Sequence, residues 1–326
     1  MRIITKAFTA IVAVCLIATT AACGSPSSDG SKGSGASKSL TVGYVAYTLA
    51  ATPQQDLKKG SEEQAKKYGY TLKTVESQGS ADKANSLIQS FVTQGVDAIV
   101  VDSYGADSLT AGIMAATSKQ IPVYLAYAPA DSDSAAGVVQ VNAGTETADL
   151  MVKDLGNSGS VLAFTLPAGP NCASSEKQFD DVMAKNPGWK VQKQQVAVPG
   201  WEQAAATTTT GWLKSHPKGS PLAIWSCWDG PGVGAASALK QAGRDDVNLY
   251  GQNTDAATIA LLEKGQYTAS YYFDSVALGR RMLDLVHANA GTPLGDIKHT
   301  FERFPKILVD QETLTDFLAK YPQVKG

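Results

Sequence analysis

The stretch LTVGYVA (residues 40–46) opens the alternation of elements that decides the fold of this chain. Its apolar and β-branched residues predict a buried strand, and the next segment (residues 55–68) has helical spacing of polar and apolar side chains. The strand patterns YTLKTV, DAIVV and IPVYLAY follow, separated by helical patterns over residues 81–94 and 107–119. Apolar strands that alternate with helices predict a parallel sheet with helices on both faces.

The same order of elements recurs in the second half of the chain. It begins with the strand pattern SVLAFTL (residues 160–166) and continues through GWKVQKQQV, LAIWS and VNLYGQN. The intervening helices are expected over residues 175–185, 201–214 and 232–242, and residues 138–144 are expected to lie between the halves. A late strand (267–273), a helix (275–289) and a final strand and helix (307–321) remain. We interpret these remaining elements as crossings back between two lobes.

The sequence therefore predicts an α/β protein of two doubly wound parallel-sheet lobes joined by a three-crossing hinge. One core seldom fills the roughly 300 residues that follow the amino-terminal segment, which also favours two lobes. We expect an N-lobe of residues 40–142 and 274–303 and a C-lobe of residues 143–273 and 304–326. Ligands bind beyond the carboxyl ends of parallel strands, so the two sheets should face a cleft that closes around a small molecule.

The amino-terminal segment predicts export and a lipid anchor. A positive start is followed by an apolar run (residues 7–18) that is too short for a permanent membrane span, which is typical of a secretory signal over residues 1–22. The small residues before Cys23 resemble the bacterial lipobox, with Thr20 in place of the usual leucine, and this implies that Cys23 takes a diacylglycerol. An ordinary signal peptide with an incidental cysteine is the alternative. Residues 23–39 have the composition of a flexible tether, so the protein should sit on the outer face of the cytoplasmic membrane.

Composition and motifs argue against catalysis. The 326 residues are 44% hydrophobic and 18% charged with a net charge of −2, which predicts a soluble body with no basic face for nucleic acid. The three histidines, His216, His287 and His299, are far apart and lack metal-ligand spacing. No G-x-S-x-G or G-x-x-x-x-G-K-[ST] motif occurs, and in DGPGVGAA (residues 229–236) the third glycine is displaced from the dinucleotide-binding spacing, which favours a tight helix start. We expect no catalytic residue, no metal and no cofactor.

Two cysteines remain in the exported body. Cys15 leaves with the signal and Cys23 would carry lipid, which leaves Cys172 and Cys227. In an oxidising compartment this pair suggests a disulfide, and both cysteines follow strands whose carboxyl ends share one sheet edge. Two unrelated buried thiols are the alternative.

Aromatic and amide side chains collect where the predicted strands end. Rings that face sugar C–H groups, beside amides and carboxylates that hold hydroxyls, suit a neutral polyhydroxyl ligand. Gln54, Ser103 and residues 167–172 also follow strands. For Trp201 we predict stacking on the ligand, and packing under its own lobe is the alternative. The predicted ligand-binding residues are Tyr47, Gln55, Tyr104, Tyr127, Asn142, Trp201, Trp228, Asp229, Asn253 and Phe273.

Over residues 40–324 the chain resembles the ribose- and galactose-type periplasmic binding proteins, the solute receptors of ABC importers. The resemblance is carried by KKGSEEQAKKYGYTL, QGVDAIVV, IPVYL, GVGAASALKQAG and LLEKGQYTASYYFDSVALGRRM. It implies the type I periplasmic-binding-protein fold, a monomer that delivers its ligand to an ABC permease, a stacking role for Trp201, and places for Asn142 in the inter-lobe segment and Asp229 in the turn before the Gly-rich helix.

Several positions depart from that family's pattern. The sugar-clamping arginine is missing between residues 173 and 178, and TPQQ (residues 52–55) replaces NPFF. Trp228, Asn253 and Phe273 stand where the family has asparagine, aspartate and glutamine. Fewer charged groups favour a sugar derivative, a polyol or a nucleoside. We expect a lipid-anchored solute receptor; a ligand sensor for a membrane kinase and an extracellular enzyme are the alternatives.

Overall fold

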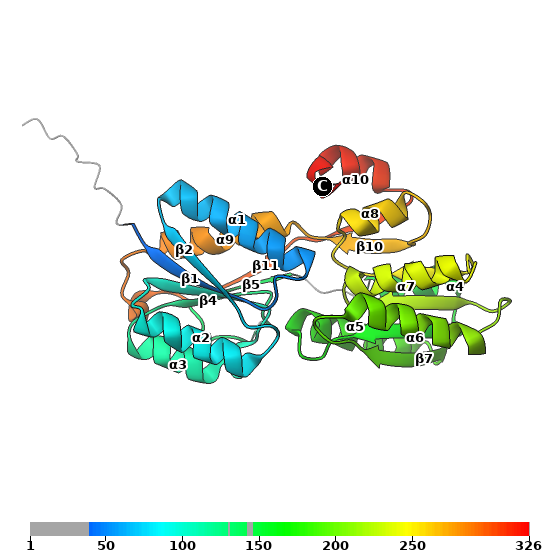
Figure 1. Cartoon of the computed structure of the whole chain (residues 1–326), viewed down its shortest axis with the longest axis horizontal. Helices are drawn as coiled ribbons and strands as arrows, with labels where there is room; N and C mark the ends of the chain where they lie inside the picture. The colour runs from blue at the N-terminus through cyan, green and yellow to red at the C-terminus, as the bar shows by residue number, and fades with distance from the viewer. Residues whose placement is uncertain (1–38, 130, 142–145, 326) are drawn as a thin grey trace, which may run out of the picture. The chain divides into compact units, whose positions relative to one another are not determined.

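The computed structural model describes residues 39–129, 131–141 and 146–325, which form two α/β lobes, each built on a six-stranded sheet (Figure 1). The prediction of two α/β lobes is confirmed. The predicted signal peptide, Cys23 and the predicted tether except its last residue, Ser39, lie outside the described residues.

The first lobe holds the amino-terminal elements and two elements that return late in the chain. The order is β1 (Thr41–Ala46), α1 (Thr52–Tyr68), β2 (Thr71–Glu76), α2 (Ala81–Thr93), β3 (Ala98–Asp102), a 3-10 turn (Ala106–Leu109), α3 (Thr110–Ser118), β4 (Val123–Ala126) and β5 (Gly137–Val141), followed later by α9 (Ser275–Ala288), a 3-10 turn (Leu294–Asp296) and β11 (Thr300–Phe304). The sheet order is β11-β5-β4-β3-β1-β2, and every pair of neighbours is parallel.

The second lobe repeats this plan. Its elements are α4 (Glu146–Leu155), β6 (Ser158–Thr165), α5 (Pro170–Lys185), β7 (Gly188–Gln195), α6 (Trp201–Ser215), β8 (Leu222–Ser226), α7 (Asp229–Gln241), β9 (Val247–Tyr250), α8 (Ala256–Leu262), β10 (Ala269–Tyr272), β12 (Ile307–Asp310), α10 (Leu314–Lys320) and a 3-10 turn (Pro322–Lys325). The sheet order is β12-β10-β9-β8-β6-β7. The edge strand β12 runs antiparallel to β10, so this sheet is mixed and not wholly parallel.

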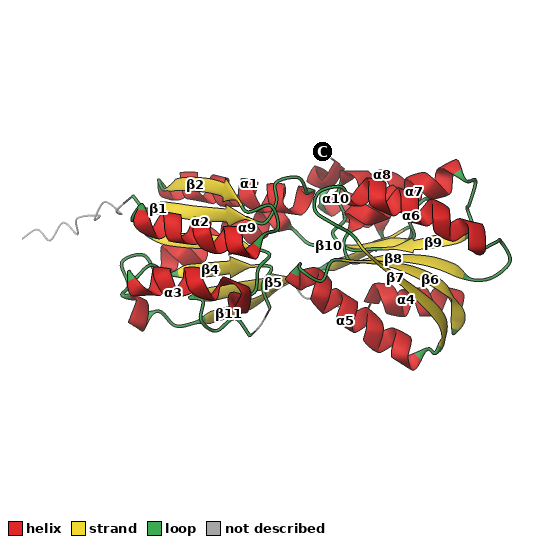
Figure 2. Ribbon diagram, turned by 60° about the horizontal axis from the view of Figure 1, so that its bottom comes forward, coloured by secondary structure: helices red, strands yellow, loops and turns green. Residues whose placement is uncertain are grey.

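The chain passes between the lobes three times: between β5 and α4, between β10 and α9, and between β11 and β12. Each sheet has helices packed on both faces, as Figure 2 shows. In the N-lobe, α1 and α9 bury one face, and α2 and α3 bury the other. In the C-lobe, α6, α7, α8 and α10 cover one face, while α4 and α5 cover the other.

The helices α1 and α9 approach each other unusually closely. A Cβ atom on Gly60 would clash with the carbonyl oxygen of Val276, and one on Gly279 would clash with that of Leu57. Ser61 adds a buried hydrogen bond from its hydroxyl to the Gly279 carbonyl at 3.2 Å. These contacts hold α9 against α1. Because α9 follows most of the C-lobe in the chain, they fix the point where the chain returns to the N-lobe.

The structure differs from the sequence expectations at several elements. Helices α1, α5 and α7 each begin three to five residues before the predicted starts, and proline lies in the first turn of α1 and α5, where its missing N–H costs no helical hydrogen bond. The segment expected to lie between the halves contributes a strand, β5, to the N-lobe sheet. Helices α4 and α8 and strand β11 were not predicted.

Candidate functional site

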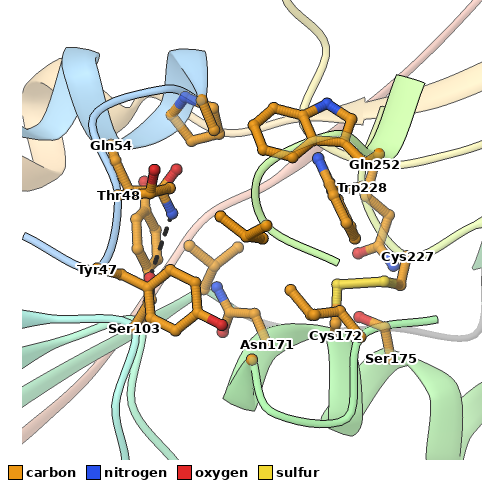
Figure 3. A pocket seen from close by; sticks show the side chains of 18 of the residues that line it. Tyr47, Thr48, Gln54, Ser103, Asn171, Cys172, Ser175, Cys227, Trp228 and Gln252 are labelled. Carbon is orange, nitrogen blue, oxygen red and sulfur yellow. Dashed lines mark hydrogen bonds between the residues drawn. A yellow bond between two sulfur atoms is a disulfide. The ribbon is translucent and has the colours of Figure 1, made fainter. Parts of the chain in front are cut away.

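A cavity lies between the carboxyl ends of the two sheets and is lined by both lobes and by the β10–α9 crossing (Figure 3). It encloses about 770 Å³ of empty space, its open mouth included. Its lining residues are Tyr47, Thr48, Ala51, Pro53, Gln54, Ser103, Tyr127, Val141, Leu166, Gly169, Asn171, Cys172, Ser175, Val198, Trp201, Cys227, Trp228, Gln252 and Phe273. A site between two parallel sheets is the place where this class of fold binds ligands.

The C-lobe wall of the cavity carries two indole rings. Trp201 is the first residue of α6 and Trp228 precedes α7, and their rings meet edge to face with centroids 6.0 Å apart. Gly230 makes room for this contact, because a Cβ atom there would lie 2.6 Å from Trp228 Nε1 and closer still to Trp201 Nε1. This explains one glycine of the DGPGVGAA segment as a packing requirement.

Three further rings come from the N-lobe and the hinge. Tyr127, which follows β4 with a left-handed backbone (φ 56°), donates its hydroxyl to Ser275 Oγ at 2.8 Å and meets Phe273 edge to face at 5.7 Å. Tyr47 follows β1, and its ring packs at 5.1 Å from that of Tyr104. Burial raises the pKa of Tyr47 and of Tyr127, so both phenols stay neutral.

The polar lining is uncharged. Gln54, Ser103, Asn171, Ser175 and Gln252 supply amides and hydroxyls from both lobes. None of the described residues that line the cavity is Asp, Glu, Lys, Arg or His. Aromatic faces beside neutral donors and acceptors can bind a ligand that has both apolar C–H surface and hydroxyl groups.

A disulfide forms part of the cavity wall. Cys172 in the first turn of α5 is bonded to Cys227, which follows β8, and their Cα atoms are 5.0 Å apart. The strands β6 and β8 that precede these two residues are neighbours in the sheet, which brings the two cysteines to the same edge. The bond ties the α5 turn, which carries Asn171, to the turn that carries Trp228.

A buried aspartate supports the N-lobe wall from behind. Asp102 ends β3 and accepts hydrogen bonds from the Tyr44 hydroxyl at 2.8 Å and from the Tyr47 backbone N–H at 2.9 Å. Burial raises the pKa of Asp102 to about 7, although the hydrogen bonds from Tyr47, Tyr44 and Ser103 oppose that change. Asp102 therefore fixes the backbone of a cavity residue while its own carboxyl stays out of the cavity lining.

The predicted ligand-binding residues divide into two groups. Tyr47, Tyr127, Trp201, Trp228 and Phe273 lie together in the cavity wall. Gln55, Tyr104, Asp229 and Asn253 do not line it. Asn142 lies outside the described residues.

Each of the four residues that do not line the cavity has another place. Gln55 is exposed and donates to the Leu49 carbonyl at 2.8 Å, and Tyr104 is buried behind Tyr47 with its hydroxyl 2.7 Å from Ser77 Oγ. Asn253 has a left-handed backbone (φ 80°) and lines a separate hollow at the β10–α9 crossing.

Asp229 is the buried first residue of α7 and lies in a hydrogen-bonded network. It accepts hydrogen bonds from Ser270 Oγ at 2.8 Å and from the Tyr267 hydroxyl at 3.1 Å. Burial, with the nearby charge of Asp255, raises the pKa of Asp229 well above its usual value. A carboxyl held this way serves the packing of the C-lobe and is not a group that reaches the cavity.

Two amides that line the cavity, Gln54 and Gln252, are not among the predicted ligand-binding residues, although Gln54 follows the first predicted strand. Helical phase could have identified Gln54, because it shares a face of α1 with the buried residues Leu57 and Ser61. The sequence gives a weaker signal for Gln252. The residue follows the β9 pattern, but its direction depends on the left-handed backbone of Asn253, which the sequence does not fix.

Within the described residues, no cluster of three or more His, Cys, Asp or Glu side chains is placed to bind a metal ion. In the same part of the chain, no helix has the length and apolar character that crossing a membrane requires.

Comparisons with known proteins agree with this geometry. A family model described as periplasmic binding protein domain matches residues 42–292. A xylitol-binding protein from Mycolicibacterium smegmatis is 30% identical over 216 residues, which span 64% of this chain and 60% of that relative, less than two thirds of its length. A putative rhizopine-binding protein from Rhizobium meliloti is 27% identical over 276 residues, 81% of this chain and 88% of the relative. The structure of an ABC transporter solute binding protein from Agrobacterium vitis with bound allitol superposes with a TM-score of 0.80 at 23% identity, covering 87% of this chain and 99% of that one.

Proposed function

The chain belongs to the periplasmic binding protein domain family, and on that premise we propose that it is an extracytoplasmic receptor that captures a small sugar-like or polyol ligand and delivers it to an ABC importer. The observation that carries this proposal is the cavity between the lobes, walled by aromatic rings from both lobes and by uncharged amides and hydroxyls. A ligand that contacts both walls would favour the closed arrangement of the lobes over an open one, and such hinge closure is an established way for a two-lobed binding protein to take up its ligand.

The relatives narrow the first ligands to test. A xylitol-binding relative and a structure with bound allitol both concern polyols, and the rings of this cavity suit the C–H face of such molecules. We also propose that the protein acts as a monomer and that Cys23 is acylated, which would make a lipid its contact with the membrane. The small residues before Cys23 and the Gly- and Ser-rich segment after it support the anchor.

A thermal-shift screen tests the binding function directly. The panel contains pentoses, hexoses, pentitols, hexitols, inositols and nucleosides. A ligand that binds only the folded protein at a hundred times its Kd adds about 2.7 kcal/mol to the free energy of unfolding, so the true class should raise the melting temperature clearly. Calorimetric titration then gives the affinity. A panel in which no compound raises the melting temperature would contradict the proposed function, and a shift by nucleosides alone would favour the nucleoside-binding alternative.

Delivery is tested with the importer itself. The liganded protein should stimulate ATP hydrolysis by its ABC permease and ATPase in proteoliposomes, while the unliganded protein should stimulate it less. Activation of a membrane kinase, with no effect on an importer, would favour the sensing role instead.

A further inference from the structure

Two amides on opposite lobes line the cavity, and each has one buried polar atom without a hydrogen-bond partner. Gln54 Oε1 and Gln252 Nε2 are buried, and neither has a hydrogen-bond partner among the described residues. Thr209 and Thr254, which also have such an atom, do not line the cavity. Buried polar groups in folded proteins are nearly always hydrogen-bonded, so each amide needs a further partner, and a ligand in the cavity that both residues line would supply it.

The Gln54 amide is oriented by its neighbour. Its Nε2 donates to Ser103 Oγ at 3.2 Å, shown as the dashed line in Figure 3, which leaves Oε1 as an acceptor. If the amide were turned around, the Ser103 hydroxyl could donate to Oε1 and Nε2 would be left over. One polar atom of Gln54 is therefore available in either orientation, and a hydroxyl group can serve both cases because it donates and accepts.

The two amides reach the cavity from different lobes. Gln54 lies in the first turn of α1 in the N-lobe, and Gln252 follows β9 in the C-lobe, on the other side of the cavity (Figure 3). A molecule that bonds to both amides must lie between the lobes, so the same pair of contacts couples binding to lobe closure.

The charge of the lining limits what that molecule can be. The described lining contains no Asp, Glu, Lys, Arg or His, and aromatic rings form part of its wall on both lobes. A charged ligand would lose its hydration on entry and meet no opposite charge, whereas a hydroxyl group would meet an amide acceptor and an amide donor.

We propose that Gln54 and Gln252 are the opposed hydrogen-bond partners of the ligand, and that they and the uncharged wall restrict the ligand to neutral polyhydroxyl compounds. This inference rests on the proposed function and deepens it by naming the specificity residues and by excluding sugar acids, amino sugars and sugar phosphates.

Matched ligands test the exclusion. Ribose is compared with ribose 5-phosphate and ribonate, glucose with glucosamine, xylitol with xylitol 5-phosphate, and myo-inositol with myo-inositol 1-phosphate, and allitol is a further neutral probe. At least one neutral probe should raise the melting temperature of the wild-type protein, and the charged compounds should not. A charged compound that binds as tightly as the best neutral one overturns the inference while leaving the solute-binding function intact. If no probe of either kind binds, the proposed function fails first and the inference fails with it.

Two variants test the residues with the best neutral probe. Gln54→Leu and Gln252→Leu should each weaken binding at least tenfold, while the unliganded melting temperature stays the same or rises, because an unpartnered buried amide has been removed. The controls are Gln55→Leu on the exposed side of the same helix turn and Gln241→Leu at the end of α7, both of which should bind as the wild type does. Wild-type affinity in a folded Gln54→Leu or Gln252→Leu protein overturns the assignment, and so does a fall in the unliganded melting temperature without loss of affinity.

Discussion

The rings of Trp201 and Trp228 meet edge to face in the cavity wall, with their centroids 6.0 Å and their planes 68° apart. Trp201 is 8% exposed and also packs in the apolar core of the C-lobe, so it has a structural role and a cavity-facing role at once. Ligand stacking and packing under its own lobe were the two alternatives for Trp201; the ring packs in the lobe and also lines the cavity, and stacking on the ligand stays a prediction.

Trp201→Ala should therefore weaken both binding and folding. Truncating a buried Trp typically costs roughly 3–5 kcal/mol of stability, and loss of a stacking ring should reduce affinity at least tenfold. The matched control is Trp212→Ala in the same helix, because Trp212 is 4% exposed, packs in the same core and does not line the cavity. Urea unfolding and calorimetric titration should show a stability loss in both variants and an affinity loss in Trp201→Ala alone. Equal affinity in the two variants would end the stacking assignment.

Gly230→Ala should act on the two indoles without removing either. The new Cβ would displace the Trp228 and Trp201 rings, and we expect binding to weaken at least tenfold, about 1.4 kcal/mol. Gly211→Ala is the control, since nothing lies within 4 Å of a Cβ at that position in α6. It should leave binding unchanged and stabilise the helix by roughly 0.5–1 kcal/mol. An unchanged affinity in Gly230→Ala would show that the geometry of the two rings does not matter for the ligand.

The disulfide should contribute to both stability and binding. Removing it through Cys172→Ser and Cys227→Ser should lower stability by roughly 2–4 kcal/mol, since the unfolded chain loses a cross-link over 55 residues. It should also weaken binding, because the α5 turn that carries Asn171 is no longer tied to the turn that carries Trp228. Non-reducing mass spectrometry of the exported protein checks the bond itself, and two free thiols would refute it. Wild-type affinity in the double serine variant would limit the bond to a role in stability.

The buried carboxyl of Asp102 predicts a pH-dependent stability. Burial, with a smaller contribution from the nearby Glu76, raises the pKa of this group from 3.8 to about 7. Below about pH 4 the carboxyl is protonated in both the folded and the unfolded states. Between about pH 4 and pH 7 the Asp102 carboxyl is ionised in the unfolded chain and still protonated in the folded protein. The folded state therefore binds more protons, and the free energy of unfolding falls as the pH rises. The pKa of Asp102 differs by about three units between the folded and unfolded states, which corresponds to a loss of unfolding free energy on the order of 4 kcal/mol by pH 7.

Asp102→Asn isolates this contribution from those of other carboxyls. The neutral amide mimics the protonated carboxyl that the wild type carries at pH 4, since each keeps one carbonyl oxygen for the Tyr47 N–H and presents a donor toward Tyr44, so the two proteins should have similar stability at pH 4. By pH 8 the variant should be the more stable of the two, because only the wild type carries the ionisation penalty. Urea unfolding of both proteins at several pH values between 4 and 8 measures the difference in their free energies of unfolding. A difference that stays constant from pH 4 to pH 8 would contradict the raised pKa.

Cys23 is expected to carry the lipid anchor. Cys23→Ala should leave the protein unprocessed at this site and unlabelled by a fatty-acid probe added to growing cells. Cell fractionation should then find less of the variant than of the wild-type protein in the lipid-anchored membrane fraction. Labelling at the wild-type level would rule out acylation at this residue.

The sequence by itself determined the two-lobed α/β plan, because that plan is a local property. Strand patterns such as LTVGYVA (residues 40–46) and LAIWS (residues 222–226) are continuous apolar runs, and the helices between them show their own periodicity. The same local signals placed Tyr47, Trp201 and Trp228 near strand ends, and strand ends meet at one sheet edge in any parallel α/β lobe.

Only the tertiary structure decided which side chains reach the cavity. Gln54 and Gln55 are adjacent in sequence, and the packing of α1 against α9 turns the first toward the cavity and the second toward solvent. Asp229 resembles a ligand-binding carboxylate in sequence, yet the hydroxyls of Ser270 and Tyr267 hold it inside the C-lobe. The direction of β12 and the place of β11 depended likewise on pairing with strands far away in the chain. Side-chain direction at a site is set by contacts between distant segments, and those contacts exist only after both lobes have formed.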